Sequence, residues 1–491
     1  MLNYNLLEQE WIPVLYRDGI RKRVNILEAF AQANRIREVA ASNPMDRVAV
    51  LRFLLALLYW CKGNPPDAKD SLSSFPPDWF EKLDDNKDCF SLLGDGKRFY
   101  QCKSKSGKER RLSANYLMQE VPTGTNVRHF RHCTDYKDGL CPACCALGLL
   151  RLPAFATQGG QGKSPGINQK PPVYVLPLGT SLTETLGLLW RARPDLDFGT
   201  PAWEKADVAL PESGNVPLLV GLTWLPRRVW LDDPTEPADT CIVCGHKGRL
   251  IRQSVFAGLG SAKTGGAGAA RVWRDPHTLG EDDKVLKPSD ALGAPDAAAG
   301  KWAQVVSGIL TGKEPPEQAR LWVVGFATDQ NKYLEAKEEE IRLVGGLEEE
   351  TVRQGLERID RWQREVWKLV PRAKPREPGR KVKHVEILPA IAAIRPQAEG
   401  NVSATIGELL LKGDDAWERA ARKYSPMMAA VAKSLSPGVT TAALRRRREI
   451  EYLKPDMRPK APEGVNAERK KGGTNDSNGT VRQSLDADEI W

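Results

Sequence analysis

The pattern of apolar and polar positions near the start of the chain predicts a strand followed by a helix. An apolar run at Trp11, Ile12 and Val14 precedes a polar turn and a second run from Val24 to Leu27. Short runs separated by polar residues are typical of a strand, a turn and the entry to a helix. Pro13 lacks a backbone N–H, so we expect it at a sheet edge or at the end of its strand.

The next apolar stretch has helical spacing. Its members recur every three or four positions, at Val48, Leu51, Leu54, Leu55 and Leu58. This spacing predicts a core helix with one apolar face and with Asp46 as its N-cap. From residue 65 to residue 108 the chain is rich in Pro, Asp and Lys, which predicts loops around short elements such as residues 79–83.

Further along, short apolar runs alternate with glycine-bearing loops. Strands are predicted at residues 173–176, 218–222 and 322–326. The stretch from Cys145 to Leu152 predicts a short buried helix that Pro153 ends. A loop follows from Ala154 to Ser164, and a second flexible stretch covers residues 257–268.

Beyond Lys332 the pattern becomes charged and helical. Residues 338–369 carry an apolar stripe at helical spacing, and further helices are predicted around residues 382–394, 416–434 and 439–453. Consecutive helices with short connections favour an antiparallel four-helix bundle. We therefore predict an α+β protein with a mixed α/β domain at residues 1–335, a helical bundle at 336–455 and a disordered polar tail at 456–491.

Composition narrows the class of protein. A length of 491 residues favours two or three domains, and 41% apolar residues suffice for real cores. The net charge of +9 is compatible with nucleic acid without demanding it. The longest apolar run, residues 48–60, is too short for a membrane span and contains Arg52. The start lacks a secretory pattern and the nine cysteines are an odd number, so we expect a cytoplasmic protein.

Two Cys-x-x-Cys pairs carry the clearest chemistry. Cys141 and Cys144 form the first pair, and Cys241 and Cys244 form the second, one hundred residues later. Each pair presents two thiolates from a tight turn, so we predict a structural Cys₄ zinc site that is closed to substrate. The alternative is a set of buried thiols or a redox pair. Other candidate ligands near these pairs are His246, Cys133 and Cys145.

Enzymatic motifs are incomplete. Gly162-Lys163-Ser164 resembles the end of a phosphate-binding loop, but Thr157 stands where its first glycine belongs and Pro165 interrupts the helix that should follow. The five histidines form no His-x-x-x-His pair, and no Gly-x-Ser-x-Gly elbow occurs. The sequence therefore predicts no catalytic site.

The glycine loops suit an approach to DNA. A backbone with few bulky side chains can come close to a duplex, and one lysine among glycines can reach a groove edge. Phe130 lies in a polar loop with Arg128, Arg131 and His132, as expected of an aromatic that stacks on a base. The alternative is that these are ordinary mobile loops. A basic cluster at residues 445–448 has the same two interpretations.

Several motifs together resemble a known family. Phe130 precedes the first cysteine pair, which is followed by Cys241-x-x-Cys244-Gly245 and by Trp273-x-x-Pro276-His277. Gly325-Phe326-x-x-x-Gln330 comes next, ahead of the helical region. This order resembles the CasA family, the large subunit of the type I-E CRISPR surveillance complex called Cascade, over roughly residues 6–453.

The resemblance implies a fold and a role. Family members combine an N-terminal α/β domain holding zinc with a C-terminal four-helix bundle. They read the protospacer-adjacent motif of double-stranded DNA from its minor groove, help to open the duplex, and recruit the helicase-nuclease.

The resemblance also implies DNA-contacting residues. Phe130 and His132 fall in the loop that contacts DNA and the crRNA-bearing core, and Gln330, with Asn331 beside it, matches a wedge next to the motif. Lys263 matches the groove-reading lysine, with Arg252 or Arg271 as substitutes. The family's glycine loop corresponds to Ala154, Phe155, Ala156, Thr157, Gln158, Gly159 and Gly160.

We therefore expect a non-enzymatic DNA-binding subunit with structural zinc. Its expected partners are double-stranded target DNA, the crRNA-containing Cascade subunits and the helicase-nuclease. A metal-dependent nuclease is the first alternative, and a subunit that serves assembly alone is the second.

Overall fold

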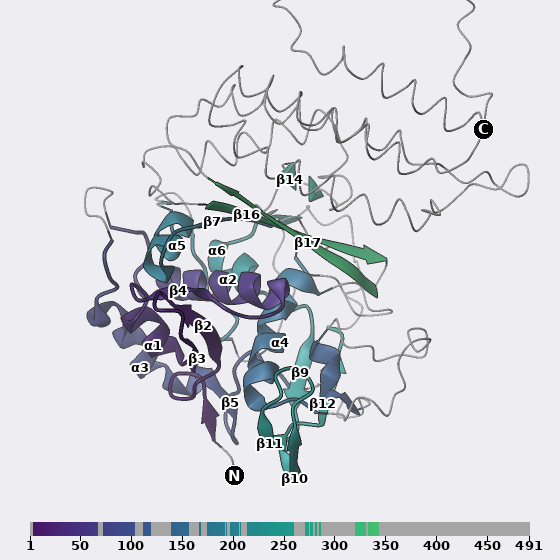
Figure 1. The fold of residues 1–491 in the computed structure, drawn as a ribbon. Coiled ribbons are helices and arrows are strands. Elements are labelled where there is room, and N and C mark those ends of the chain that lie inside the picture. Colours follow the sequence, from purple (N-terminus) through teal and green to yellow (C-terminus); the bar gives the residue numbers. More distant parts are fainter. Residues whose placement is uncertain are drawn as a thin grey trace, which may run out of the picture. The chain divides into compact units, whose positions relative to one another are not determined.

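The computed structural model divides the chain into two compact units, Met1–Arg353 and Gln354–Trp491 (Figure 1). All residues that the structure describes belong to the first unit, so the predicted tail and the predicted bundle beyond residue 342 lie outside them. The described residues are 3–66, 72–103, 111–118, 139–156, 166–167, 174–191, 193, 197–205, 207, 214–259, 271–273, 275–277, 280–281, 284–285, 320–329 and 332–342.

The first unit begins with a three-stranded antiparallel sheet in the order β3-β2-β4 and a helix after its second strand. Its strands are β2 (Ile12–Tyr16), β3 (Arg21–Val24) and β4 (Ile36–Val39), and α1 spans Ile26–Ala31. Asn25 and Glu28 form a capping box at the start of α1. The predicted strand, turn and helix are confirmed. Pro13 is the second residue of the middle strand, whose pairing with β4 starts at Val14.

Helix α2 (Pro44–Cys61) passes through the centre of this unit (Figure 1). The predicted helix is confirmed, but its cap and its exposure differ from expectation. Asn43 is the N-cap, because its Oδ1 accepts the Met45 N–H at 2.9 Å, and Asp46 lies inside the first turn. Apolar residues are buried around the whole circumference of α2, which is the pattern of a core helix enclosed by other elements.

Helix α4 (Pro142–Phe155) packs against α2. The two helices are joined by a buried ion pair, in which the Arg151 guanidinium donates to both Asp46 oxygens at 2.6 and 2.8 Å. The prediction that Pro153 ends this helix is wrong. The helix continues to Phe155, so Ala154 and Phe155 are buried helical residues and not loop residues.

The segment Leu218–Thr223 forms helix α6, so the strand predicted there is wrong. Leu218, Leu219 and Leu222 are buried against α2 and α4. A Cβ on Gly221 would lie 2.2 Å from the Trp273 ring, so the ring fills the space above this glycine. Helix α5 (Leu182–Leu189) begins at Ser181, whose hydroxyl accepts the Glu184 N–H.

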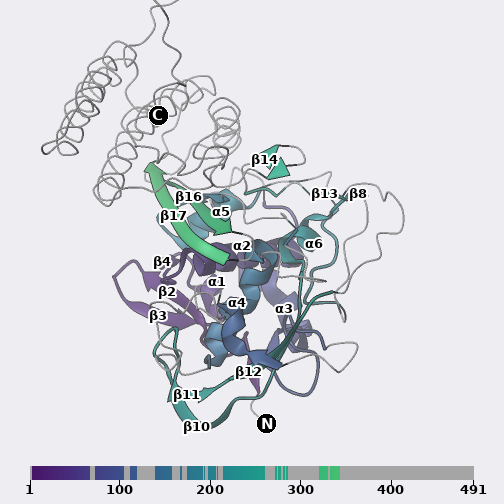
Figure 2. The ribbon, with the colours of Figure 1, turned by 90° about the vertical axis from the view of Figure 1, so that its right-hand side faces the viewer.

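A second antiparallel sheet, in the order β17-β16-β7, contains two of the predicted strands. Its long strands β16 and β17 lie side by side in Figure 2. It is formed by β7 (Tyr174–Leu178), β16 (Arg320–Asp329) and β17 (Lys332–Arg342). Strands at residues 173–176 and 322–326 are thus confirmed for their described parts. The helix predicted from Glu338 is wrong for residues 338–342, which belong to β17. Trp322 is buried and donates its indole N–H to Glu338 at 3.0 Å.

Smaller elements complete the described part of the chain. A sheet in the order β6-β12-β9 consists of Arg111–Ser113, Gln253–Ala257 and Arg228–Leu231. The others are β1 (Tyr4–Asn5), β5 (Ser91–Leu93), β8 (Gly214–Asn215), β10 (Thr235–Thr240), β11 (Lys247–Leu250), β13 (Arg271–Val272), β14 (Gly280–Glu281), β15 (Lys284–Val285), η1 (Pro77–Phe80), α3 (Glu81–Asp85), η2 (Lys87–Phe90) and η3 (Ala114–Leu117). Within these residues no helix has both the length and the apolar content that a bilayer crossing requires.

Candidate metal centre

The first cysteine pair is placed by the start of α4. Cys141 is the N-cap residue, Pro142 occupies the first helical position, and Cys144 lies in the first turn. The Cys145 N–H donates to the Cys141 carbonyl at 3.0 Å. Backbone N–H groups at a helix N-terminus favour negative charge. The local fold therefore presents two sulfur atoms at the N-terminus of one helix.

The second pair lies in the turn between β10 (Thr235–Thr240) and β11 (Lys247–Leu250). The Cys241 N–H donates to the His246 carbonyl at 2.8 Å, and the Gly245 N–H donates to the Cys241 carbonyl at 2.9 Å. Gly245 has a φ of +71°, a conformation that glycine adopts without steric cost. These bonds close the turn and direct the thiols of Cys241 and Cys244 to one side.

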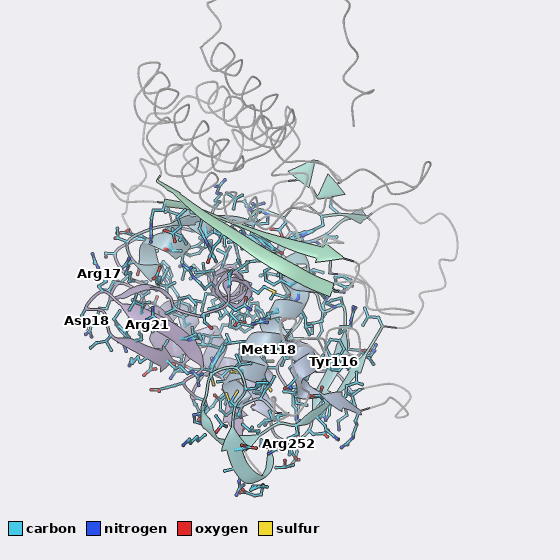
Figure 3. All side chains as sticks on the ribbon, turned by 45° about the vertical axis from the view of Figure 1, so that its right-hand side comes forward. Arg17, Asp18, Arg21, Tyr116, Met118 and Arg252 are labelled. Atoms are coloured by element: carbon cyan, nitrogen blue, oxygen red, sulfur yellow. The ribbon has the colours of Figure 1, made fainter. Side chains whose placement is uncertain are left out.

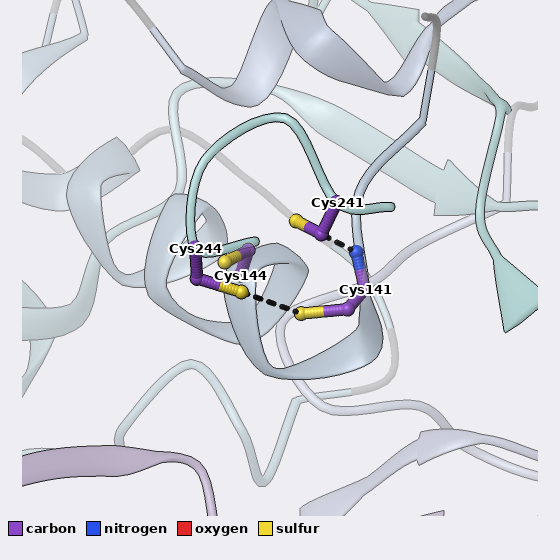
Figure 4. A group of neighbouring side chains, drawn as sticks. All are labelled: Cys141, Cys144, Cys241 and Cys244. Atoms are coloured by element: carbon purple, nitrogen blue, oxygen red, sulfur yellow. Dashed lines mark hydrogen bonds between the residues drawn. The ribbon is translucent and has the colours of Figure 1, made fainter. Parts of the chain in front are cut away.

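The two pairs converge, as the sequence predicts (Figure 4). The four sulfur atoms all lie within 4.8 Å of one another. Cys141 Sγ is 3.6 Å from Cys244 Sγ, and the Cys141 N–H donates to Cys241 Sγ at 3.3 Å. A tetrahedron with metal–sulfur distances of about 2.3 Å has sulfur–sulfur edges of about 3.8 Å. The cluster therefore has the size of a four-thiolate metal site, and its cysteines are free thiols.

The charges of these thiols compete with one another. Hydrogen bonds with Cys141, and then with Cys241 and Cys244, raise the pKa of Cys144. Hydrogen bonds from Cys141 and Cys144 lower the pKa of Cys241 to about 6 and also lower the pKa of Cys244. The cluster by itself therefore favours a mixture of thiols and thiolates. A divalent cation would allow all four sulfurs to carry negative charge together.

Nearby side chains complete the surroundings of the cluster. Burial lowers the pKa of Arg23 in β3, but a hydrogen bond with Cys244 and the charge of that thiolate raise it by more. The pKa of Arg23 is therefore raised overall. Cys145 is buried, and burial raises its pKa, but it does not join the cluster. His246 is exposed and also stands outside the four-cysteine group. Cys133 lies outside the described residues.

Other predicted site residues divide into two groups. Ala154, Phe155 and Ala156 are described, and their exposures are 4%, 2% and 7%. Their side chains are packed in the interior, so any glycine loop starts after them. The two substitutes for Lys263 are also described: Arg252 lies 3.4 Å from Asp239, and Arg271 begins β13. The other DNA-contacting candidates lie outside the described residues: Phe130, His132, Thr157, Gln158, Gly159, Gly160, Lys263, Gln330 and Asn331.

The described residues nevertheless locate where these segments begin and end. Residues 119–138 run from buried Met118 to Gly139, and the next residue, Leu140, pairs with Ile251. Residues 157–165 lie between Ala156 and Gly166, whose N–H donates to the Ala156 carbonyl at 2.7 Å. Gln330 and Asn331 lie between Asp329 and Lys332, which are paired across β16 and β17.

The sequence patterns did not predict a buried polar cluster that follows Trp273 in the chain. Arg52 of α2 donates to both oxygens of Asp275 at 2.7 Å, and its guanidinium lies over the Tyr174 ring, 5.0 Å from the centroid. The His277 N–H donates to Asp275 Oδ1 at 3.0 Å. Burial, together with the charge of Arg52, lowers the pKa of His277 to about 3. The only sequence signal was an arginine inside an apolar helix.

Comparisons with known proteins agree on one family. The model of the family described as CRISPR-associated protein Cse1 matches residues 5–450. A protein of Thermus thermophilus described as CRISPR-associated protein CasA/Cse1 is 26% identical over 432 residues, which cover 81% of this chain and 80% of the relative.

Solved structures share the fold. A crystal structure of Thermus thermophilus CasA has a TM-score of 0.64 at 20% identity and covers 93% of this chain and 100% of its own. Thermobifida fusca Cse1 has a TM-score of 0.62 at 20% identity, with coverage of 93% and 99%. A chain of a CRISPR RNA-guided surveillance complex has a TM-score of 0.61 at 13% identity, with coverage of 92% and 100%.

Proposed function

Because the chain belongs to the CRISPR-associated protein Cse1 family, we propose that it is the non-catalytic large subunit of a Cascade complex and reads a short motif in double-stranded DNA. In this role it assembles with the crRNA-containing subunits, opens the duplex beside the motif, and recruits a helicase-nuclease. The observation that carries the proposal is the convergence of four cysteines, two of which stand at the start of the helix that follows the segment containing Phe130 and His132.

The metal centre supports the segment that contains Phe130 and His132. Leu140 and Cys141 directly follow that segment, and Leu140 is paired with Ile251 just after β11. A metal bound by Cys141 and Cys241 ties these two strands of chain together. The centre therefore limits the positions that the C-terminal end of the segment can take, which reduces the entropy lost when the segment binds DNA.

Helix α4 extends this support to a second segment. The helix begins at the metal ligands and ends at Phe155, a length of about 21 Å. Ala156, at its end, accepts the hydrogen bond of Gly166 that brackets residues 157–165. A rigid helix between the two sites suits a subunit that must present separate loops to one duplex in fixed register.

Zinc is the ion that we assign to the cluster. Four cysteine thiolates in a tetrahedral arrangement are the usual ligand set of structural zinc, and such a site leaves no position for substrate. Cys141, Cys144, Cys241 and Cys244 would hold the ion, which supplies only cross-linking between α4 and the β10–β11 hairpin. Catalysis at this centre is not part of the proposal.

The experiment uses full-length protein assembled with its guide RNA and partner subunits. Gln330→Ala should reduce opening of the duplex, followed by the fluorescence of a base analogue beside the motif, by more than it reduces duplex binding. A Lys332→Gln variant, which changes a neighbouring charge, is the control and should open the duplex normally. Equal losses of binding and opening would contradict a wedge role for Gln330.

Motif reading is tested separately. Lys263→Ala should reduce the ratio of affinities for intact and scrambled motifs, by about tenfold for one groove contact. Identical affinities of the unmodified complex for both duplexes would instead favour a subunit that serves assembly alone. Cleavage of DNA by the isolated chain in the presence of metal would favour the nuclease alternative.

A further inference from the structure

The hairpin β2–β3 and the neighbouring strand β4 carry an unusual group of exposed cations. We call it the hairpin basic surface; its members are Arg17, Arg21, Lys22, Arg35 and Arg37, and all five are exposed. Arg17 and Arg21 lie near the tip of the hairpin (Figure 3). None of these residues belongs to the candidate metal centre or to the predicted DNA-contacting loops.

Strand pairing brings these cations together. Arg21 lies opposite Leu15 across β2 and β3, while Arg37 belongs to β4 on the other side of β2. The Arg17 N–H donates to the Arg35 carbonyl at 2.9 Å, so these two residues are neighbours. Adjacent strands are about 4.8 Å apart, which places the backbones of β3 and β4 about 10 Å from one another. Side chains of successive strand residues point to opposite faces, so Lys22 extends from the other face of β3 than Arg21, and its Nζ lies 5.5 Å from the centroid of the Tyr16 ring. The four arginines therefore share one small surface, with Lys22 at its edge.

The acidic residues of this region are already engaged. Asp18 accepts the Ile20 N–H at 3.0 Å in the hairpin turn, and Glu28 caps α1. Glu38 lies 3.5 Å from Arg47. Within the described part of the chain, the four arginines of the hairpin basic surface form no ion pair. Asp18 and Glu38 keep their negative charges and offset part of this group, so the five cations leave a net excess of positive charge on the surface.

We propose that the hairpin basic surface binds the sugar–phosphate backbone of double-stranded DNA without reading its sequence. Duplex DNA carries one negative charge per about 1.7 Å of its axis, so several phosphates can face a surface of this width. Arginine, which forms four of the five charges, binds phosphate through two parallel hydrogen bonds. The inference rests on the proposed function, since it adds a second contact to the same duplex.

Apolar content distinguishes DNA from an acidic protein as the partner. Protein interfaces contain a buried apolar or aromatic centre surrounded by a polar rim. Ile20, at 58% exposure, is the single exposed large apolar side chain in the described residues. One isoleucine among five cations does not form such a centre, whereas a phosphate backbone needs only the charges. Arg23 of the same hairpin contacts Cys244, so the surface adjoins the metal centre.

The test neutralises the four arginines together with Arg17→Gln, Arg21→Gln, Arg35→Gln and Arg37→Gln. Binding of the full-length chain to a duplex that lacks the motif is measured from about 50 to about 200 mM salt. If all four arginines face phosphates, the slope of log affinity against log salt becomes shallower by about 3 to 4, since each contact contributes about 0.9. Affinity at the lowest salt should fall by at least about tenfold.

A control variant removes the same charge elsewhere, at exposed lysines: Lys62→Gln, Lys82→Gln, Lys103→Gln and Lys205→Gln. Its salt slope should stay within about one unit of the unmodified chain, and both variants should retain the unmodified melting temperature. An equal change of slope in the two variants would overturn the proposal, because it would reflect net charge alone.

Two further outcomes separate this inference from the proposed function. The arginine variant should keep the ratio of affinities for intact and scrambled motifs, because backbone contacts carry no sequence information. If the unmodified complex binds intact and scrambled motifs with equal affinity, the proposed function is contradicted. The difference in salt slope between the two variants would still stand. Normal duplex binding combined with failure to assemble with the partner subunits would overturn the inference in favour of an acidic protein surface.

Discussion

The α2–α4 core and the β10–β11 hairpin are held together by different forces. Nearly every side chain of α2 and α4 is buried, so removal of apolar surface from water stabilises their packing. Strand β10, in contrast, is almost entirely exposed. Two exposed strands with few apolar contacts are marginal in water without further support. Four converging cysteines tie this hairpin to α4, so the metal that we assign to them would substitute for a hydrophobic core at the edge of this domain.

The two regions share α4. Cys141 and Cys144 stand at its N-terminal end, while Arg151 near its other end joins α2 through Asp46. Loss of the metal should therefore release the hairpin while the core remains folded. Damage to the core should instead lower the stability of the whole N-terminal unit. Variants of the two regions test whether they are stabilised independently, and the first has the largest expected effect.

The largest effect is expected from Cys241→Ser. Removal of one of four thiolates should reduce the bound zinc from about one equivalent to nearly none, because most of the affinity of about 10 kcal/mol or more depends on the complete set. Hydrogen exchange should then accelerate in β10 and β11 but not in α2. Cys89→Ser, outside the cluster, is the control and should retain its metal. Faster exchange throughout α2 would contradict a local role for the centre.

Asp46→Ala tests the core. It removes the carboxylate that accepts two hydrogen bonds from the Arg151 guanidinium, which is at 0% exposure. Loss of one member of a buried ion pair costs about 3 to 5 kcal/mol, so the unfolding midpoint in denaturant should fall strongly while the zinc content stays the same. The double variant Asp46→Ala with Arg151→Met should recover much of the loss. If the double variant were no more stable than Asp46→Ala, the buried charge of Arg151 would not be the cause of the lost stability.

Features encoded locally were predictable from the sequence. The strand, turn and helix at the start, the span of α2, and β16 follow from apolar spacing and turn residues. The convergence of the two cysteine pairs was also predictable, although the pairs are one hundred residues apart, since each pair needs only its own tight turn. Apolar spacing and turn residues were sufficient wherever residues close in the sequence determine the structure.

The errors have non-local causes. An apolar run as short as Leu218–Thr223 suits either a strand or a helix, and packing against α2 and α4 decides for the helix. Asp46 resembles an N-cap, but its partner is Arg151, far along the chain. The Arg52–Asp275 pair joins residues 223 positions apart, which no periodicity can predict. Pro153 lies inside α4, and every residue of this helix is buried by packing against other elements, so the helix continues past the proline.

Gly221→Ala sharpens the account of the core. The added Cβ would lie 2.2 Å from the Trp273 ring, so the ring or the helix must shift. Overpacking of this kind costs up to about 3 kcal/mol. Gly187→Ala is a matched control, because Gly187 also lies in a helix but its nearest neighbour is 4.0 Å away. The control should be neutral or more stable by up to about 1 kcal/mol, and equal destabilisation of the two variants would refute the packing argument.

His277 gives the core a dependence on pH. Its pKa is about 3 in the folded protein, against about 6.5 for an unperturbed histidine, so the unfolded chain binds more protons between these values. The stabilising contribution is present above pH 6.5 and is lost as the pH falls toward 3. Protonation linked to His277 should lower the free energy of unfolding by about 2 kcal/mol between pH 7 and pH 5.

The measurement compares denaturant unfolding of the unmodified chain with that of His277→Gln at both pH values. Zinc release in acid affects both proteins equally, so the difference between them isolates the histidine. The variant should lose less stability on acidification. Parallel losses in the two proteins would assign the acid sensitivity to the metal centre or to other groups.

The smallest effect concerns the boundary of the metal centre. Arg23 contacts Cys244, the exposed member of the cluster, and its positive charge offsets part of the negative charge that four thiolates place around one divalent ion. Arg23→Gln should speed transfer of zinc to a competing chelator by about tenfold, as expected for a group that contacts a ligand without binding the metal. Arg21→Gln, exposed on the same strand, removes the same charge without this contact. If both variants released zinc at the same rate, general electrostatics and not the hydrogen bond to Cys244 would set the stability of the site.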